Sequence, residues 1–152
     1  MPDGRAESVH LRVYPAIPSA WLDPALGEKW KTVRALRRVV TGALELERAE
    51  KRIGSSLQAA PHVHAGSAFI GALKGLDLTE ICITSGGDLV EVPDGGVLPT
   101  GAFTLPDVAG VAVVPAPAGG QKCARCWQVL EEVGKSAAHP LLCERCEGAV
   151  TA

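Results

Sequence analysis

Four of the five cysteines of this chain form two closely spaced pairs near its end. The first pair lies in the segment KCARCW at 122–127 and the second in LLCERC at 141–146. Two residues separate the cysteines of each pair, so one tight turn can direct both sulfur atoms at the same ion. Two such turns complete a tetrahedral set of soft thiolate ligands, which predicts one structural zinc ion. The predicted ligands are Cys123, Cys126, Cys143 and Cys146.

The neighbours of the cysteines support a closed, structural metal site. Four protein ligands leave no position for water, so the zinc is predicted to stabilise a short segment and not to catalyse a reaction. Positive charge beside the ligands, at Lys122, Arg125 and Arg145, favours the thiolate form. Two redox-active pairs or unligated surface thiols are the alternatives, and iron is the rival metal. His139 lies between the pairs and is an alternative ligand.

Other residues that could do chemistry carry weaker signals. Trp127 directly follows the second ligand and either caps the metal site or projects as a flat surface on which a base can stack. His62 and His64 alternate like strand neighbours with half-exposed side chains, and Cys82 is expected to be a small buried hydrophobe. The sequence contains no GxxxxGK[ST] phosphate loop, no GxSxG elbow and no HExxH pair. We therefore expect no catalytic centre in this chain.

Charge is unevenly distributed along the chain. The net charge of −2 excludes a uniformly basic nucleic-acid binder. Residues 24–53, however, hold eight Lys/Arg against four Asp/Glu, whereas 55–121 hold one Lys against six acids. No stretch approaches the ~20 apolar residues of a membrane span, and no apolar run follows the first charges as in a signal peptide. These features predict a cytoplasmic protein without membrane contact, in which paired cysteines bind metal and do not form disulfides.

The elements that must position these residues begin with a long helix. The first 20 residues are rich in Pro and turn formers and predict an extended lead-in. Asp23 is a suitable N-cap and Pro24 suits the first helical position. An apolar stripe with spacings of three and four then predicts a helix over about 24–53, ended by Gly54 in a left-handed conformation. The stripe consists of Leu26, Trp30, Val33, Leu36, Val40 and Leu44.

The middle of the chain is predicted to mix short helices and strands. GSAFIGALKG at 66–75 predicts a short helix, and SGGDLVEVPDGG at 85–96 a hairpin. Strands are predicted in LTEICITS at 78–85, GDLVEV at 87–92 and VAGVAVVPA at 108–116. PAPAGGQ at 115–121 is expected to be a flexible joint. The predicted fold class is α+β, with a long helical part at 1–58, a small α+β linker unit at 59–118 and a zinc knuckle at 119–152.

Three stretches taken together resemble the C-terminal region of bacterial isoleucyl-tRNA synthetase. Residues 7–59, from ESVHLRV to GSSLQA, resemble the end of the helical anticodon-binding domain of that family, and the α+β linker follows them. Residues 120–146, from GQKCARCW to LLCERC, are similar to a zinc finger that the synthetase shares with formamidopyrimidine-DNA glycosylases. KRIGSSL at 51–57 and KCARCW are the specific parts of this resemblance. The resemblance covers about residues 7–148.

This resemblance implies a role in tRNA recognition. It implies that the chain contacts the anticodon stem-loop of isoleucine tRNA, with Arg125 at a base edge or phosphate and Trp127 stacked on a base. The basic helix face would follow the phosphates, through Lys31, Arg34, Arg38 and Arg48. The ATP-binding signatures HIGH and KMSKS of the family are absent, so isoleucyl-adenylate would be made by synthetase domains outside this chain.

Other functions remain open at the level of the sequence. The chain could be a protein-interaction module that docks on a separate synthetase body, or a zinc finger protein with another nucleic-acid specificity. A zinc-dependent redox switch is a third class, against which a closed site argues. In each case we expect a monomer.

Overall fold

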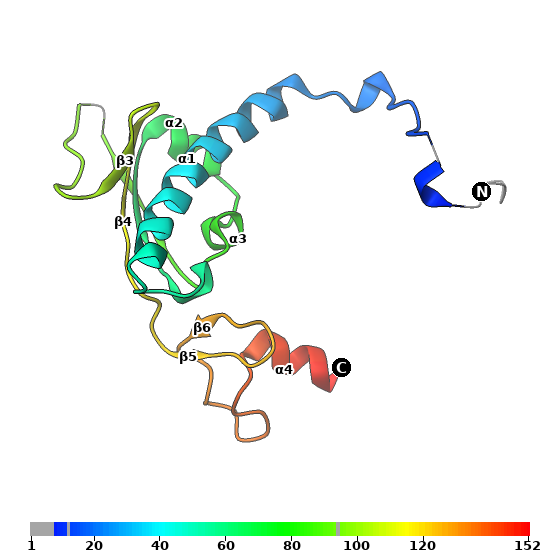
Figure 1. The fold of residues 1–152 in the computed structure, drawn as a ribbon, viewed down its shortest axis with the longest axis vertical. Helices are drawn as coiled ribbons and strands as arrows, with labels where there is room; N and C mark the ends of the chain where they lie inside the picture. Colours follow the sequence, from blue (N-terminus) through cyan, green and yellow to red (C-terminus); the bar gives the residue numbers. More distant parts are fainter. Residues whose placement is uncertain (1–7, 12, 94) are drawn as a thin grey trace.

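The computed structural model describes residues 8–11, 13–93 and 95–152. Figure 1 shows a body, which we define as residues 24–114, and a knuckle, residues 119–152, that lies at one end of it. The body contains the helices α1 (Pro24–Ala49), α2 (Ser67–Leu73) and α3 (Leu78–Cys82), the 3-10 turn η3 (Ser56–Gln58), and the strands β1 (His62–Gly66), β2 (Asp88–Val92), β3 (Phe103–Leu105) and β4 (Val108–Val114). The knuckle contains β5 (Gln121–Lys122), β6 (Val129–Leu130) and α4 (Glu144–Thr151). These elements confirm the predicted α+β class.

The lead-in is extended, as predicted, in the residues that the structure describes. It holds two single 3-10 turns, η1 (Val9–Leu11) and η2 (Ser19–Trp21), and runs away from the body (Figure 1). Large apolar side chains described in it are exposed, among them Tyr14 (96%) and Trp21 (75%). Among the described helices, none combines the length and the hydropathy that a membrane span requires.

Helix α1 begins where the sequence predicts and ends slightly earlier. The Asp23 carboxylate accepts a hydrogen bond from the Leu26 N–H (2.9 Å), and Pro24 occupies the first position. The helix ends at Ala49, followed by Lys51 in the left-handed conformation (φ 59°) and a bond from Arg52 N–H to Glu47 O (2.9 Å). The prediction that Gly54 provides the left-handed stop was wrong, since Lys51 takes that position.

The core lies between α1 and a four-stranded sheet. The strand order is β2-β1-β4-β3, with β1 and β2 parallel and the other pairs antiparallel. Val33, Leu36, Val40 and Leu44 of the predicted stripe are buried against Val63, Ala65, Val111 and Val113 of the sheet. Leu26 and Trp30 are more exposed because the first turns of α1 extend past the sheet (Figure 1). One hydrophobic core thus contains residues from both sides of position 58. The division into units at 1–58, 59–118 and 119–152 remains a prediction.

Two predictions for the middle of the chain were wrong. Residues 78–85 contain the helix α3 and not a strand, because the Asp77 carboxylate caps it by accepting from Thr79 N–H (2.7 Å) and Glu80 N–H (3.4 Å). Leu78, Ile81 and Cys82 then form a helical face against the core. The segment 85–96 is not a hairpin, because β2 pairs in parallel with β1 after the crossover through α2 and α3. The predicted short helix α2 and the strands β2 and β4 are confirmed.

Two glycines of α1 allow its packing on the sheet to be tested. A Cβ at Gly42 would lie 2.7 Å from the Phe103 ring, whereas one at Gly27 would meet nothing within 4 Å. We expect Gly27→Ala to stabilise the helix by up to about 1 kcal/mol. Gly42→Ala should be less stable than Gly27→Ala by about 1–3 kcal/mol, because its Cβ must displace the Phe103 ring. Thermal unfolding followed by circular dichroism measures both, and equal stabilisation by the two variants would contradict this packing.

Candidate metal centre and nucleic-acid interface

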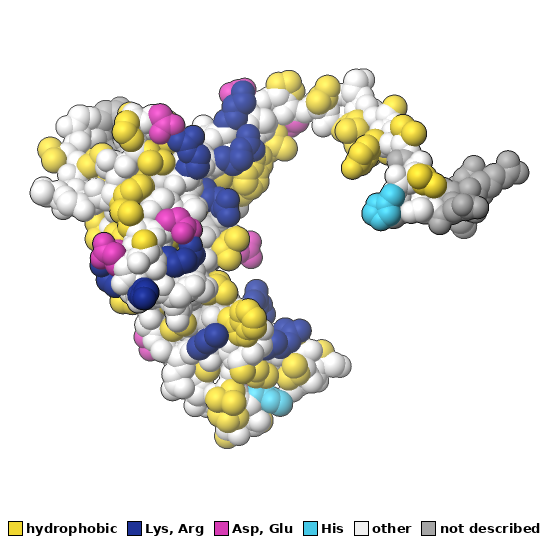
Figure 2. All heavy atoms as spheres, viewed as in Figure 1, with side chains coloured by type: hydrophobic (Ala, Val, Ile, Leu, Met, Phe, Trp, Pro, Cys, Tyr) yellow, Lys and Arg dark blue, Asp and Glu magenta, His cyan; other side chains and the backbone are white. Residues whose placement is uncertain are grey.

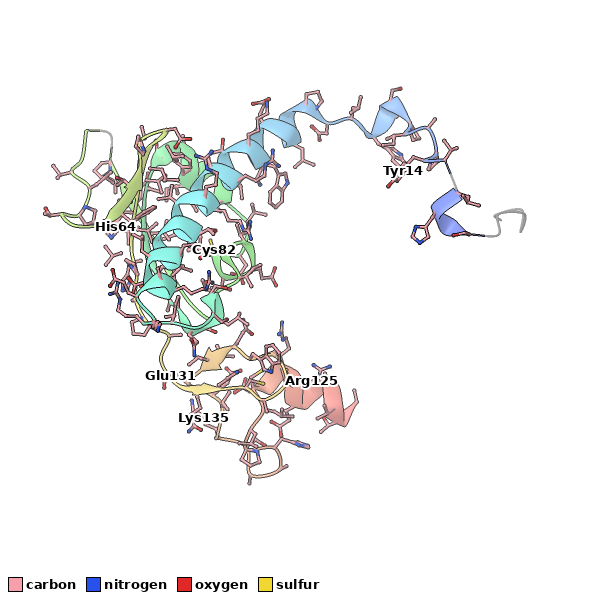
Figure 3. All side chains as sticks on the ribbon, viewed as in Figure 1. Tyr14, His64, Cys82, Arg125, Glu131 and Lys135 are labelled. Carbon is pink, nitrogen blue, oxygen red and sulfur yellow. The ribbon has the colours of Figure 1, made fainter. Side chains whose placement is uncertain are left out.

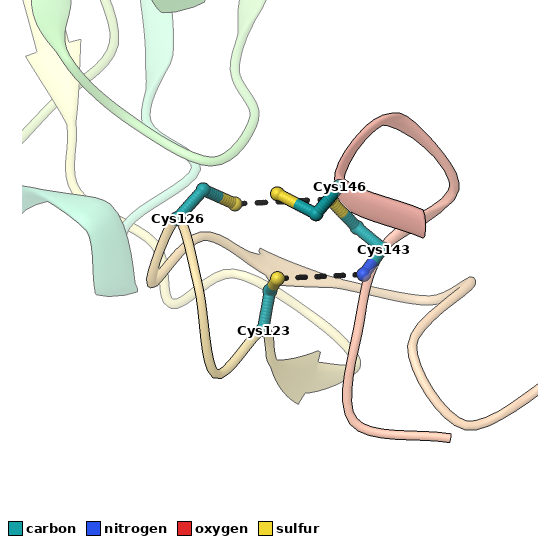
Figure 4. A group of neighbouring side chains, drawn as sticks. All are labelled: Cys123, Cys126, Cys143 and Cys146. Atoms are coloured by element: carbon teal, nitrogen blue, oxygen red, sulfur yellow. Dashed lines mark hydrogen bonds between the residues drawn. The ribbon is translucent and has the colours of Figure 1, made fainter. Parts of the chain in front are cut away.

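The sulfur atoms of the four paired cysteines lie together in the knuckle (Figure 4). All four lie within 4.8 Å of one another, and the Sγ atoms of Cys126 and Cys143 are 3.7 Å apart. A tetrahedral zinc with metal–sulfur distances of about 2.3 Å places neighbouring sulfurs about 3.8 Å apart. Within the described part of the chain, no other ligand-type side chain joins this group. The cluster therefore fits one zinc ion in a closed site.

Two short elements direct these cysteines inward. Cys123 and Cys126 follow β5 in a turn closed by bonds from Trp127 N–H to Cys123 O (3.0 Å) and from Cys123 N–H to Gln128 O (2.8 Å). The antiparallel pairing of β5 with β6 holds both ends of this turn. Cys143 is the N-cap residue of α4, and Cys146 lies in the first turn of that helix. The two halves meet where Ala124 N–H donates to Leu141 O (2.9 Å).

The surroundings stabilise negative charge on some of these sulfurs. Burial opposes ionisation of Cys123, but backbone N–H groups of Cys126, Cys143 and Arg125 outweigh it and lower its pKa to about 6. Arg125 Nη1 lies 3.7 Å from Cys146 Sγ and lowers the pKa of that thiol. Burial raises the pKa of Cys143 to about 12. Cys123 and Cys146 therefore ionise more readily than Cys143.

The remaining cysteine and the histidines take no part in this cluster. Cys82 is 7% exposed in the core, and burial raises the pKa of its thiol to about 11, which confirms the prediction of a small buried hydrophobe. His62 and His64 lie on β1, as predicted, and His62 Nδ1 is 2.9 Å from Asp88 Oδ2. His139 is half-buried in the loop before Cys143, and its backbone N–H donates to Ser136 Oγ (3.2 Å).

The basic residues predicted on the first helix share one side of α1. At 100° per residue, Lys31, Arg34, Arg38 and Arg48 fall within an arc of about 100°, opposite the buried stripe. Three of them form surface ion pairs, Lys31 with Glu28 (2.6 Å), Arg38 with Asp107 and Arg48 with Glu45. Among the described residues Arg34 forms no such pair.

A cavity of about 410 Å³ borders this basic side, between α1 and α3. Trp30, Arg34 and Arg37 line it from α1, and Asp77 and Glu80 line it from the opposite side. Its opposite charges nearly balance, so it offers no preference for a phosphate over a cation. The Arg37 guanidinium also donates to Ile81 O (2.8 Å) and joins the two helices.

Trp127 lies exposed at the surface of the knuckle. Its side chain is 60% exposed, and its backbone adopts the left-handed conformation (φ 68°), which few residues other than glycine take. The Lys122 ammonium lies 5.2 Å from the centre of the indole ring. This exposure favours the stacking surface over the cap, the two alternatives that the sequence left open. Arg125 is also exposed, on the side of the knuckle away from Lys135 (Figure 3).

Hydrogen bonds that the sequence did not predict join the knuckle to the body. The Ser85 hydroxyl accepts from Val129 N–H (2.7 Å) and donates to Leu57 O (2.5 Å). The first half of the 115–121 segment pairs with the residues just before β1. Ala60 N–H donates to Ala116 O, and Ala118 N–H donates to Gln58 O (both 2.8 Å). The prediction of a flexible joint was therefore wrong for this half. Leu57 lies in the segment KRIGSSL, which the sequence indicated only as a helix end and as part of the resemblance.

Comparison with known proteins agrees with this geometry. Residues 120–147 match the family described as the zinc finger found in FPG and IleRS. The chain is 55% identical over 134 residues to the isoleucine–tRNA ligase of Brucella abortus, a match that covers 88% of this chain and 13% of that protein. The corresponding enzymes of Rhodopseudomonas palustris (51%, over the same shares) and Agrobacterium fabrum (52%, over 89% and 14%) are also similar.

These matches confirm the resemblance predicted from the sequence. The chain spans only about an eighth of the length of the curated relatives it matches. The zinc finger match and the sulfur geometry together support one structural zinc. The chain therefore ends in a zinc finger of the type found in FPG and IleRS, and nearly nine-tenths of its length is similar to a short part of bacterial isoleucine–tRNA ligases.

Proposed function

We propose that this chain is a tRNA-contacting part of an isoleucine–tRNA ligase and that it holds the anticodon stem-loop of isoleucine tRNA. The observation that carries the proposal is the 55% identity over 88% of the chain to a protein named isoleucine–tRNA ligase. Isoleucyl-adenylate would be formed by synthetase domains outside this chain. The proposal places the chain in the cytoplasm as a monomer, with one zinc ion that stabilises the knuckle.

The distribution of charge supports contact with a nucleic acid. Figure 2 shows Lys and Arg side chains along α1 and again on the part of the knuckle that faces the same hollow side of the molecule. Contacts to phosphates do not depend on the base sequence of the nucleic acid. They require only cations within reach of its sugar-phosphate backbone. The pairs of Lys31, Arg38 and Arg48 are exposed at the surface. Exposed pairs contribute only about 0–1 kcal/mol, so phosphates can replace these carboxylates at little cost.

The exposed side chains of the knuckle support contact with bases. Sequence-specific RNA recognition stacks unpaired bases on aromatic rings and uses arginine at their edges. Trp127 offers such a ring and Arg125 lies nearby in the same turn. In our proposal the indole stacks on an anticodon base and the Arg125 guanidinium bonds a base edge or phosphate.

The salt dependence of tRNA binding tests the role of α1. Affinity falls as the salt concentration rises, and each phosphate contact that is lost should make the slope of log affinity against log salt shallower by about 0.7–0.9. We expect this change for Arg34→Gln and Arg38→Gln, measured by filter binding of isoleucine tRNA at several salt concentrations. Lys135→Gln removes a charge from the far side of the knuckle and should leave the slope unchanged. Equal slopes for all four proteins would contradict the phosphate contacts.

The exposed lead-in favours a second candidate function. Val13, Tyr14, Ile17, Trp21 and Leu22 are each at least 75% exposed, which is unusual for large apolar side chains of a free protein. A protein-interaction module that docks on a separate synthetase body would cover them. In that case binding to the synthetase body would survive high salt, and tRNA binding by the chain alone would be weak.

A further inference from the structure

A cavity of about 320 Å³ lies between the end of the body and the knuckle. Gly54, Ser55 and Gln58 line it from the turn after α1, and Lys122 and Trp127 line it from the knuckle. It therefore joins the two segments, KRIGSSL and KCARCW, that carried the resemblance. Its volume is at the lower limit of the roughly 300–1,000 Å³ of ligand pockets, which suits one planar group and not an extended ligand.

The lining offers an aromatic surface, one cation and hydrogen-bond donors. Gln58 Oε1 accepts from Gly54 N–H (2.6 Å) and Ser55 N–H (3.3 Å), which fixes the amide and leaves its NH₂ group for another partner. The NH₂ group forms no hydrogen bond with another described residue. Ser55 Oγ accepts from Leu57 N–H (3.1 Å), so its proton can be donated elsewhere. No carboxylate is among the described lining residues, and this composition favours an anionic ligand with an aromatic ring.

The two walls are held at a fixed distance by Ser85. Its hydroxyl bonds to Leu57 O of the turn and to Val129 N–H, two residues after Trp127. The bond from Ala118 N–H to Gln58 O (2.8 Å) fastens the same turn to the segment that leads into the knuckle. Trp127 itself is held in a sparsely populated backbone conformation. The backbone that carries the indole is thus held in place before any ligand arrives.

We propose that this cavity binds one unpaired nucleotide of the tRNA. Its base stacks on Trp127, its edge accepts hydrogen bonds from the Gln58 amide and the Ser55 hydroxyl, and its phosphate pairs with Lys122. This inference rests on the proposed function and extends it, because the site that recognises the base then combines the knuckle with the body. Ser85 is a positioning residue of this site.

A pair of isosteric substitutions tests the contribution of the body. Gln58→Glu keeps the oxygen that accepts from Gly54 and Ser55, so the turn is preserved, but it replaces the donor with a negative charge. We expect it to weaken binding of isoleucine tRNA to the zinc-loaded chain by about tenfold, the effect of one lost hydrogen bond and added repulsion. Gln121→Glu makes the same charge change on β5, outside the cavity, and should change affinity by less than about twofold. Equal affinity of the two variants would overturn the nucleotide site and leave the proposed function standing.

Nuclear magnetic resonance gives an independent readout of the same site. An RNA hairpin with the anticodon loop of isoleucine tRNA is titrated into the isotope-labelled, zinc-loaded chain. The Trp127 indole and the Gln58 side-chain amide should shift together. A shift of Trp127 without Gln58 would place the base outside the cavity, and no shift at either residue would also overturn the site. If intact tRNA fails to bind the wild-type chain at low salt, the proposed function itself fails.

Discussion

Cys126→Ser is expected to release the zinc and unfold the knuckle while α1 remains helical. Three of the four buried residues in the core of the knuckle are the ligands Cys123, Cys143 and Cys146, so little apolar core remains without the metal. Structural zinc contributes about 10–16 kcal/mol of apparent binding free energy in zinc-finger peptides near neutral pH. Since even partners outside the ligand set alter metal affinity about 10–100-fold, loss of one thiolate should lower zinc affinity by more than about a hundredfold.

Metal content and helix content together measure this effect. Zinc released per chain should fall from one in the wild type to nearly none in Cys126→Ser, and chelation of the wild-type protein should have the same result. The far-ultraviolet circular dichroism signal should stay close to that of the wild type, since α1 contains 26 residues and packs on the sheet. Cys82→Ala is the matched control, because it removes the one cysteine outside the cluster and should retain one zinc. Cooperative unfolding of the whole chain on chelation would contradict a knuckle that unfolds alone.

Trp127→Ala is expected to weaken binding of isoleucine tRNA by about 1–3 kcal/mol, which is the usual contribution of one base stacked on an aromatic side chain. The indole is exposed and contributes little to the knuckle core, so thermal stability should change much less than affinity. Alanine keeps the Cβ atom, so the backbone strain at φ 68° is the same in the variant and the wild type. Any change in affinity then reports the loss of the ring.

Trp127→Phe is the matched control for stacking. A smaller ring still offers an aromatic face, so its affinity should lie between those of the wild type and the alanine variant. Fluorescence anisotropy with labelled tRNA gives the affinities, and zinc content and thermal unfolding give the stability. Unchanged affinity with clearly reduced stability would make Trp127 a structural cap of the metal site.

Local signals in the sequence were sufficient to predict the metal centre and the main helix. The spacing of the cysteines depends only on the turn geometry around each pair, and the Asp23 cap acts within one helical turn. Residues 78–85 were misassigned because their β-branched side chains favour a strand. The Asp77 cap and the burial of one helical face outweigh that preference.

Contacts between distant segments could not be predicted in this way. Ser85 joins residues 28 positions before it and 44 positions after it through single hydrogen bonds to the backbone. No periodicity or spacing encodes such a contact. The same limit applies to the cavity lined by Gln58 and Trp127, whose two walls come from segments far apart in the sequence. The basic side of α1 was predictable. The ion pair between Arg38 and Asp107 was not, because it joins residues far apart in the sequence.

Binding of the zinc-loaded chain to isoleucine tRNA, compared with a copy that carries a different anticodon, tests the central proposal most directly. The measurement is made at two salt concentrations, so that phosphate contacts and base recognition can be separated. We predict tighter binding to the isoleucine anticodon at both concentrations and a loss of affinity for both RNAs at the higher one. Equal affinity for the two RNAs, or binding that does not respond to salt, would contradict recognition of the anticodon by this chain.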